Sequence, residues 1–376
     1  MEELINPRVN EIASSGATYA YWLMFSIPAF FAFVGERRSV NNLDSFSLRF
    51  DGLWWLFFII ITLFIGFRVQ VGGDWGSYLT YYKIISSSPL SETFDPLADP
   101  SYMFLNYLSG LYGLGIYGVN FVSALIFSLG LFVFCRSLPR PFLALTAAIP
   151  YLVIVVGMGY TRQGIALGLI MLGLVAISRN KSILFFLLIM FAATFHKTAI
   201  IMLGIAGLAS TNNKLWMFLW ASLIVYFSYT FFLSDSFERF VKYYYEQSYQ
   251  SSGALIRILM LILPASLLLF FFPRFEFNKS LELLWWWSAI ISILLFILLF
   301  TTNASTAIDR IGLYLLPIQL IVFSYLPDIF SRKGDLSKLI ILLIIFYYTL
   351  VLYVWLYFAT FSHMWQPYRN ALFEML

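Results

Sequence analysis

Long apolar runs separated by short polar breaks follow one another along almost the whole chain. A bilayer with a hydrocarbon core of about 30 Å is crossed by roughly 20 helical residues, and most of these runs approach that length. The pattern predicts an all-α polytopic integral membrane protein, a helical bundle with about 12 crossings. The runs lie near 18–34, 52–67, 101–135, 141–157, 161–177, 183–195, 198–209, 215–232, 254–272, 283–301, 308–326 and 339–361.

Two regions depart from simple crossings. The run 101–135 is too long for one helix and is interrupted at Gly113-Leu114-Gly115, which predicts an interfacial or re-entrant piece at 101–112 and a crossing at 116–135. The runs on either side of His196-Lys197 are each too short for a comfortable crossing, which predicts a helical hairpin that bends near this dipeptide.

Composition excludes a soluble protein. The chain has 376 residues, of which 61% are hydrophobic and only 11% charged, whereas average globular chains carry about 25% charged residues. The single cysteine, Cys135, permits no internal disulfide and no cysteine-rich metal site. The first 16 residues are polar and lack a basic region followed by an apolar core, so we expect no cleavable signal.

The distribution of basic residues predicts the orientation. Short loops rich in Lys and Arg face the cytoplasm, and 13 of the 23 Lys and Arg residues fall in six such loops. With these loops inside, both termini lie outside. One long tilted helix over 183–209 would place the later basic loops outside, so the hairpin is favoured. The six loops are 36–51, 136–140, 178–182, 211–214, 273–280 and 328–338.

We therefore expect a single transmembrane domain over residues 1–376 with two larger outer loops. The first, 68–100, mixes polar and aromatic residues, with a helix-compatible stretch from Trp75 to Ile85. The second is 233–253.

In this topology the ionisable residues of the membrane segments fall at or near the outer boundary. A transporter is expected to bind its cargo near the midplane, often between repeated halves, and the sequence shows no convincing repeat. One-sided placement favours an enzyme or binding site that serves the outer leaflet. The residues concerned are Arg68, Asp74, Arg162, Gln163, His196, Lys197, Asp309 and Arg310.

Arg162 is the first candidate, because arginine keeps its charge in an apolar environment and needs an anion there. It opens an apolar helix, so snorkelling to lipid headgroups is the alternative. Gln163 beside it favours a functional site. Gly164-x-x-x-Gly168 permits a neighbouring helix to approach closely.

The other candidates also have structural alternatives. His196 has an unperturbed pKa near 6.5, which suits proton transfer, but it could equally be a structural donor. Asp74 follows two glycines that permit close backbone approach, or it lies in a solvated turn. Asp309 and Arg310 either compensate one another at a helix start or belong to the site. Asp99, which precedes a proline, is expected to form a turn.

The order and spacing of several short motifs over about 68–315 resemble one family, the EpsG-type branch of the Wzy polysaccharide polymerases. Lys197 and Thr198 depart from the family's pattern, which has small polar residues there, so Lys197 is expected to be peripheral. The motifs are Arg68, Gly73-Asp74-Trp75, Tyr78, Tyr81-Tyr82, Arg162-Gln163-x-x-Ala166, Phe195-His196-Lys197-Thr198-Ala199 and Arg310-x-x-x-Tyr314.

The resemblance implies a multi-pass protein of the bacterial inner (cytoplasmic) membrane, with a site that faces the periplasm or cell exterior. Its fold would be similar to the membrane-embedded, metal-independent GT-C-type glycosyltransferases. It would join undecaprenyl-diphosphate-linked oligosaccharide repeat units into O-antigen, capsule or exopolysaccharide. The expected partners are this lipid-linked glycan and the bilayer, with a chain-length regulator as a further candidate and no nucleic acid.

In such an enzyme the acceptor hydroxyl attacks the anomeric carbon with inversion and the lipid diphosphate leaves. Arg162 and Arg310 are expected to bind the diphosphate, with Arg257 or Arg68 as a further clamp.

For the base, His196 is the first choice and Asp74 the second, while Asp309 is expected to orient Arg310 or the base. The outer segments show no carboxylates or histidines at metal-binding spacing, so we expect no metal and no other cofactor. The expected glycan contacts are Gln163, Tyr78 and Tyr314.

Two other functions remain open. A lipid-linked oligosaccharide flippase would need essential arginines at mid-helix, whereas those here begin helices. An outer-leaflet O-antigen ligase or acyltransferase would use a similar site on a different acceptor.

Overall fold

The structure is a computed structural model in which residues 18–35, 51–89, 91, 99–210, 222, 226, 253–275, 277, 279–302, 305–330 and 335–374 are described. Regular structure in these ranges is helical, apart from one isolated antiparallel bridge between Arg68 and Asn370, which confirms the all-α class. The helices are α2 (Tyr19–Val34), α3 (Gly52–Gly66), α4 (Trp75–Ser86), α6 (Pro100–Leu111), α7 (Gly115–Arg136), α8 (Pro141–Ala148), η2 (Ile149–Gly157), α9 (Thr161–Ser178), α10 (Ser182–Phe195), η3 (Lys197–Ile200), α11 (Ile201–Ser210), α14 (Ala254–Phe270), η5 (Phe272–Arg274), α15 (Lys279–Thr301), α16 (Ser305–Leu315), α17 (Pro317–Phe330), α18 (Asp335–Phe358), η6 (Ser362–Trp365) and α19 (Ala371–Glu374).

The chain is an integral membrane protein. Within the described ranges, α7, α9, α15 and α18 are each long and apolar enough to cross a membrane, and α16 with α17 could form a fifth span bent by 44°. The other apolar runs form shorter helices, so the 12 predicted crossings are not all reproduced as full spans. The run 215–232 and the loop 233–253 lie outside the described residues, apart from Ser222, Tyr226 and Gly253.

The two predicted interruptions are confirmed. Helix α6 ends at Leu111 and α7 begins at Gly115, and both Gly113 and Gly115 adopt positive φ angles that favour glycine. Helix α10 ends at Phe195, and His196 is extended, with φ −155°. The two arms have different main partners, since α10 packs chiefly on α9 and α11 on α15.

The run 308–326 was expected to be one crossing, but the structure divides it into α16 and α17. Helix α16 ends at Leu315 and α17 begins at Pro317. Proline lacks the N–H that would continue the helix and disfavours the helical conformation of the residue before it. The sequence signal was therefore present but was outweighed by the continuous hydrophobicity of the run.

Helices α7 and α9 make the closest packing in the bundle. A Cβ atom on Gly168 would lie 2.7 Å from the carbonyl oxygen of Ile126, and one on Gly130 only 2.0 Å from that of Gly168. This confirms the predicted close approach at Gly168. The contact holds α9, whose second residue is Arg162, closely against α7.

We expect Gly168→Ala to reduce the thermal stability of the purified protein. The added side chain would have to displace the backbone of α7, and overpacking of this kind costs about 1–3 kcal/mol. The thermal midpoint in detergent measures the effect. Gly52→Ala is the matched control, since a Cβ there meets nothing within 4 Å, and an equal loss in both variants would contradict the close-packing explanation.

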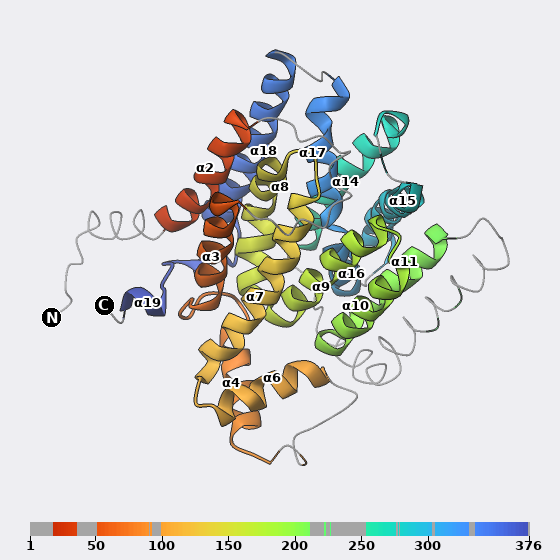
Figure 1. Cartoon of the computed structure of the whole chain (residues 1–376). Coiled ribbons are helices and arrows are strands. Elements are labelled where there is room, and N and C mark those ends of the chain that lie inside the picture. The colour runs from red at the N-terminus through yellow and green to blue at the C-terminus, as the bar shows by residue number, and fades with distance from the viewer. Residues whose placement is uncertain are drawn as a thin grey trace.

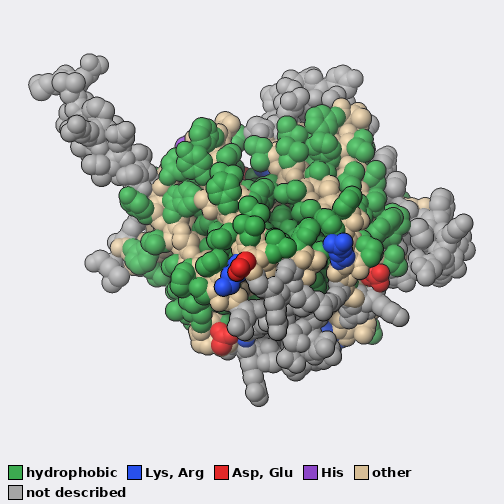
Figure 2. Space-filling model, turned by 90° about the horizontal axis from the view of Figure 1, so that it is seen from above, with side chains coloured by type: hydrophobic (Ala, Val, Ile, Leu, Met, Phe, Trp, Pro, Cys, Tyr) green, Lys and Arg blue, Asp and Glu red, His purple; other side chains and the backbone are tan. Residues whose placement is uncertain are grey.

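Charged side chains concentrate at the ends of the bundle, while much of its outside is apolar. Figure 1 shows α4 and α6 together at one end, and Figure 2 shows hydrophobic side chains over most of the described part of one face. Away from α4 and α6, the C-terminal end of α7 carries Arg136, whose guanidinium bonds Asp51 at 3.0 Å, and just beyond it Arg140 bonds Asp328 at 2.8 Å. These contacts lie at predicted inner loops.

Candidate functional site

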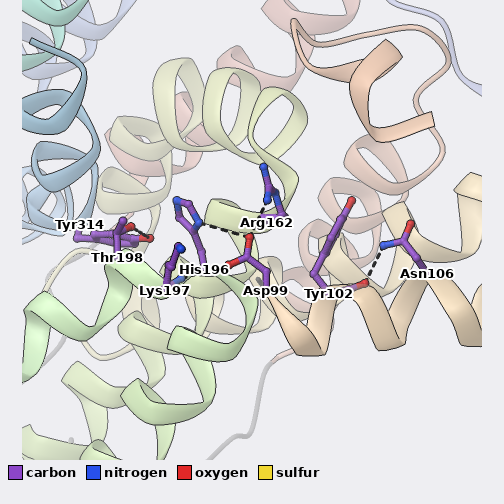
Figure 3. A network of polar contacts seen from close by, with 8 residues as sticks. All are labelled: Asp99, Tyr102, Asn106, Arg162, His196, Lys197, Thr198 and Tyr314. Carbon is purple, nitrogen blue, oxygen red and sulfur yellow. Dashed lines mark hydrogen bonds and ion pairs between the residues drawn. The ribbon is translucent and has the colours of Figure 1, made fainter. Parts of the chain in front are cut away.

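Asp99 is the centre of a polar network that joins three separate segments of the chain (Figure 3). Its Oδ2 accepts a hydrogen bond from Nη1 of Arg162 at 2.7 Å and lies 3.9 Å from Nδ1 of His196. Its Oδ1 accepts from the backbone N–H of Lys197 at 3.3 Å. One carboxylate therefore fixes Arg162 relative to the backbone next to His196.

The sequence around Asp99 predicts only a turn. Asp99 does precede α6, whose first residue is Pro100, so the turn assignment describes its backbone. Its side chain, only 6% exposed, is nevertheless part of the site. The partners Arg162 and His196 lie 63 and 97 residues further along the chain. No local spacing rule could reveal that pairing.

Arg162 is held from two sides but keeps an accessible edge. Its guanidinium carbon lies 5.9 Å from the ring centroid of Tyr78, a cation–π contact with α4, in addition to the ion pair with Asp99. The side chain is still 41% exposed. Arg162 is thus both pre-oriented and open to an anion. Tyr78, a predicted glycan contact, is buried beneath it.

The two carboxylates of the site have opposite pKa shifts. Burial raises the pKa of Asp74 above its ordinary value, and the positive charges of Arg162 and Arg310 offset this only in part. For Asp99, burial also opposes ionisation, but the interactions with His196 and Arg162 prevail and hold its pKa below the ordinary value. Asp99 is therefore a fixed carboxylate, while Asp74 accepts a proton more readily.

His196 lies between α10 and η3, outside both helices. Burial lowers its pKa below the ordinary value, and the neighbouring Asp99 compensates only in part. The imidazole is consequently neutral at pH 7 and able to accept a proton. Its side chain is 13% exposed.

Asp309 pairs with Arg257 rather than with its neighbour Arg310. Nη2 of Arg257 donates to Oδ2 of Asp309 at 2.6 Å, and a second bond joins Nε and Oδ1. The two side chains bridge α14 and α16. The alternative of a self-compensating pair of adjacent residues is therefore wrong: successive residues of a helix point in different directions.

Arg310 is exposed, and no ion pair of its guanidinium occurs among the described residues. Its backbone carbonyl accepts a hydrogen bond from Nε2 of Gln163 at 3.2 Å, which ties α16 to the first turn of α9. The charge of Arg310 lowers the pKa of both Asp74 and His196, so these three groups belong to one electrostatic environment. Gln163 thus connects the two arginine-bearing helices.

Arg68 and Tyr314 are buried, each 1% exposed. The Arg68 guanidinium donates to the carbonyls of Ile65 and Val71 and to the side chains of Asn120 and Thr161. In this structure it holds the loop before α4 against α7 and α9. Its role as a diphosphate clamp stays a prediction, and its burial favours support of the loop.

Tyr314 shares a buried hydrogen bond with Thr198, 3.0 Å between the hydroxyl oxygens. It links α16 to η3, directly beside His196. Its predicted contact with a glycan is likewise untested. Within the described ranges, no group of three or more His, Cys, Asp or Glu side chains is arranged to hold a metal ion.

Comparison with known families supports the family resemblance that these motifs predict. No similar curated protein and no similar solved structure was found. A family model described as the EpsG family, however, matches residues 52–370, which is most of the chain. The match includes Asp74, Asp99, Arg162, His196 and Arg310. The chain therefore belongs to the EpsG family, as its motifs predicted, and is a polysaccharide polymerase-like membrane protein.

Proposed function

We propose that the chain is a polymerase that joins undecaprenyl-diphosphate-linked oligosaccharide repeat units at the outer leaflet of the bacterial inner membrane. The bond forms between the anomeric carbon of one unit and a hydroxyl of another, with inversion, and the lipid diphosphate leaves. The reaction as proposed uses no metal or other cofactor. Family membership supports a polymerase, and the site supports this particular chemistry.

The observation that carries the proposal is the pair of accessible arginines beside two groups able to take a proton. Arg162 is 41% exposed although it is held by Asp99, and Arg310 is exposed and lies close enough to depress the pKa of Asp74. Guanidinium groups bind phosphate oxygens through paired N–H donors and stabilise the charge that develops on a leaving diphosphate.

In the proposed reaction, His196 takes the proton of the acceptor hydroxyl, with Asp74 as the alternative base. Asp99 holds Arg162 and the backbone next to His196 in place, so it is a positioning residue. The burial of Asp74 answers one objection to its role as the alternative base, namely that nearby arginines would make it too weak. Asp309 acts through Arg257, which we expect to lie beside the diphosphate.

Reconstitution tests the function directly. Purified protein in liposomes is given the undecaprenyl-diphosphate-linked repeat unit of its own cell, and products are separated by chain length and identified by mass spectrometry. We expect dimers and longer chains, with one undecaprenyl diphosphate released for each bond formed.

Each rival gives a different result in the same assay. A flippase would move the substrate between leaflets without forming a new linkage. A ligase would consume donor only when a different acceptor is added. Either outcome would replace the polymerase proposal. The position of Arg162, the second residue of α9, speaks against a flippase with its cations at mid-membrane.

A further inference from the structure

The chain after α18 packs against both loops that carry candidate site residues. Here η6 ends at Trp365, whose side chain is buried, with the residue only 2% exposed. The segment is far from Asp74 and Arg162 in sequence and lies outside the motifs described above. Its contacts nevertheless reach the backbone just before each of these residues.

The first set of contacts is with the loop that leads to Asp74. The backbone N–H of Gly72 donates to the carbonyl of Met364 at 2.9 Å, and that of Val69 donates to the carbonyl of Arg369 at 2.9 Å. Together with the isolated antiparallel bridge, these bonds pair the loop with the C-terminal segment. Position 72 also requires glycine, because its φ is +109°.

The second set is with the segment that leads to Arg162. Nε1 of Trp365 donates to the carbonyl oxygen of Ile154 at 2.8 Å, within the π-helix η2. A Cβ atom on Gly159 would lie 2.5 Å from Cζ2 of the indole. The ring is therefore in direct contact with the backbone three residues before Arg162.

One indole ring touches both segments. A Cβ atom on Gly73, the residue before Asp74, would lie 3.7 Å from Cη2 of the same ring. The ring thus lies between Gly73 and Gly159, and the absence of a side chain at Gly159 makes room for it. Tyr21 fixes the other side of Trp365 by donating its hydroxyl to the Trp365 carbonyl at 2.5 Å.

We propose that Trp365 is a positioning residue that sets the spacing between Asp74 and Arg162. The indole acts as a spacer between the two glycine-containing loops, and its N–H bond to Ile154 fixes its depth. The catalytic consequence rests on the proposed function, whereas the spacing itself does not. The test therefore has one arm that measures activity and one that does not.

In the activity arm, Trp365→Phe keeps a flat ring but removes the N–H donor and part of the spacer. We expect kcat to fall about tenfold, with the donor KM changed less than twofold, since displacements of about 1 Å cost up to about 100-fold. Gly159→Ala should give a similar loss by pushing the ring. The double variant should lose less than the product of the two, because Phe leaves room for the Ala side chain.

Trp55→Phe is the matched control, because it makes the same change at a tryptophan that is 45% exposed on the outside of α3. It should leave kcat unchanged. The spacer role would be overturned if the loss of kcat in the double variant equalled the product of the losses in Trp365→Phe and Gly159→Ala. A kcat within twofold of the parent in Trp365→Phe would also overturn it.

The second arm measures hydrogen exchange of the full chain in detergent. In Trp365→Phe we expect faster exchange at residues 69–73 and 158–162 and unchanged exchange at 136–140. Unchanged exchange at both loops would overturn the inference, even if activity fell. If Trp365→Phe exchanges faster at both loops but the parent protein forms no polymer, the spacer role stands and the polymerase function is rejected.

Discussion

Arg162→Ala is expected to abolish long glycan chains while single repeat units persist. In a strain that lacks the chromosomal gene, the variant should leave single units on undecaprenyl diphosphate or on their final lipid acceptor. Loss of one preorganised donor to a developing anion lowers kcat by about 100- to 1,000-fold, which would stop polymerisation after few or no additions. Electrophoresis of the extracted glycan measures chain length.

Arg179→Ala is the matched control, because it removes an arginine from the other end of the same helix, at the C-cap of α9. It should leave chain length unchanged. Arg162→Lys should be intermediate, since lysine keeps the charge but not the paired N–H geometry. Normal chains in Arg162→Ala would remove this residue from the mechanism. Loss of even single-unit product would point to translocation or ligation.

His196→Ala is expected to reduce kcat by about 100- to 10,000-fold, the range typical of a positioned general base. Because burial lowers the pKa of His196, the neutral, proton-accepting form persists below pH 6.5. The parent enzyme should therefore keep its activity down to a pH below 6.5 and lose it as the imidazole becomes protonated. The pH profile of kcat/KM in the liposome assay measures this loss of activity at low pH.

The second histidine provides the control. His363 is exposed, and its Nδ1 lies near the carbonyl of Thr360, so His363→Ala should leave the profile unchanged. If Asp74 is the base instead, the fall of kcat/KM at low pH will persist in His196→Ala and will be absent in Asp74→Asn. That result would exchange the two roles without changing the rest of the proposed site.

Helix positions were predictable wherever a run had clear ends. The breaks at Gly113–Gly115 and at His196 were found because glycine and charged residues interrupt apolar sequence there. The break before Pro317 was not, because its neighbours are uniformly apolar. Hydropathy gives the apolar length of a segment, but the bend within it depends on local backbone bonding.

The site was predictable as a set of residue types and only partly as a set of contacts. Arg162 and His196 were singled out because a charged or titratable group is costly in apolar surroundings. Asp74 was singled out because it follows two glycines and belongs to the Gly73-Asp74-Trp75 motif. Asp99 and Trp365 were not. Asp99 stands in a polar loop, where an aspartate is ordinary, and Trp365 is one of 11 tryptophans in an aromatic-rich chain. Their importance comes from long-range contacts that no local pattern records.

The ion pair between Asp99 and Arg162 also bears on how the site distinguishes its substrate from ordinary lipid. Phospholipid headgroups carry phosphate and are far more numerous than any lipid-linked glycan. An arginine already neutralised by a buried carboxylate gains little from one more weakly held phosphate. In the proposed polymerase, a ligand competes with Asp99 for the Arg162 guanidinium and needs more than one phosphate group to do so. The carboxylate would therefore disfavour the binding of bulk phospholipid at the site.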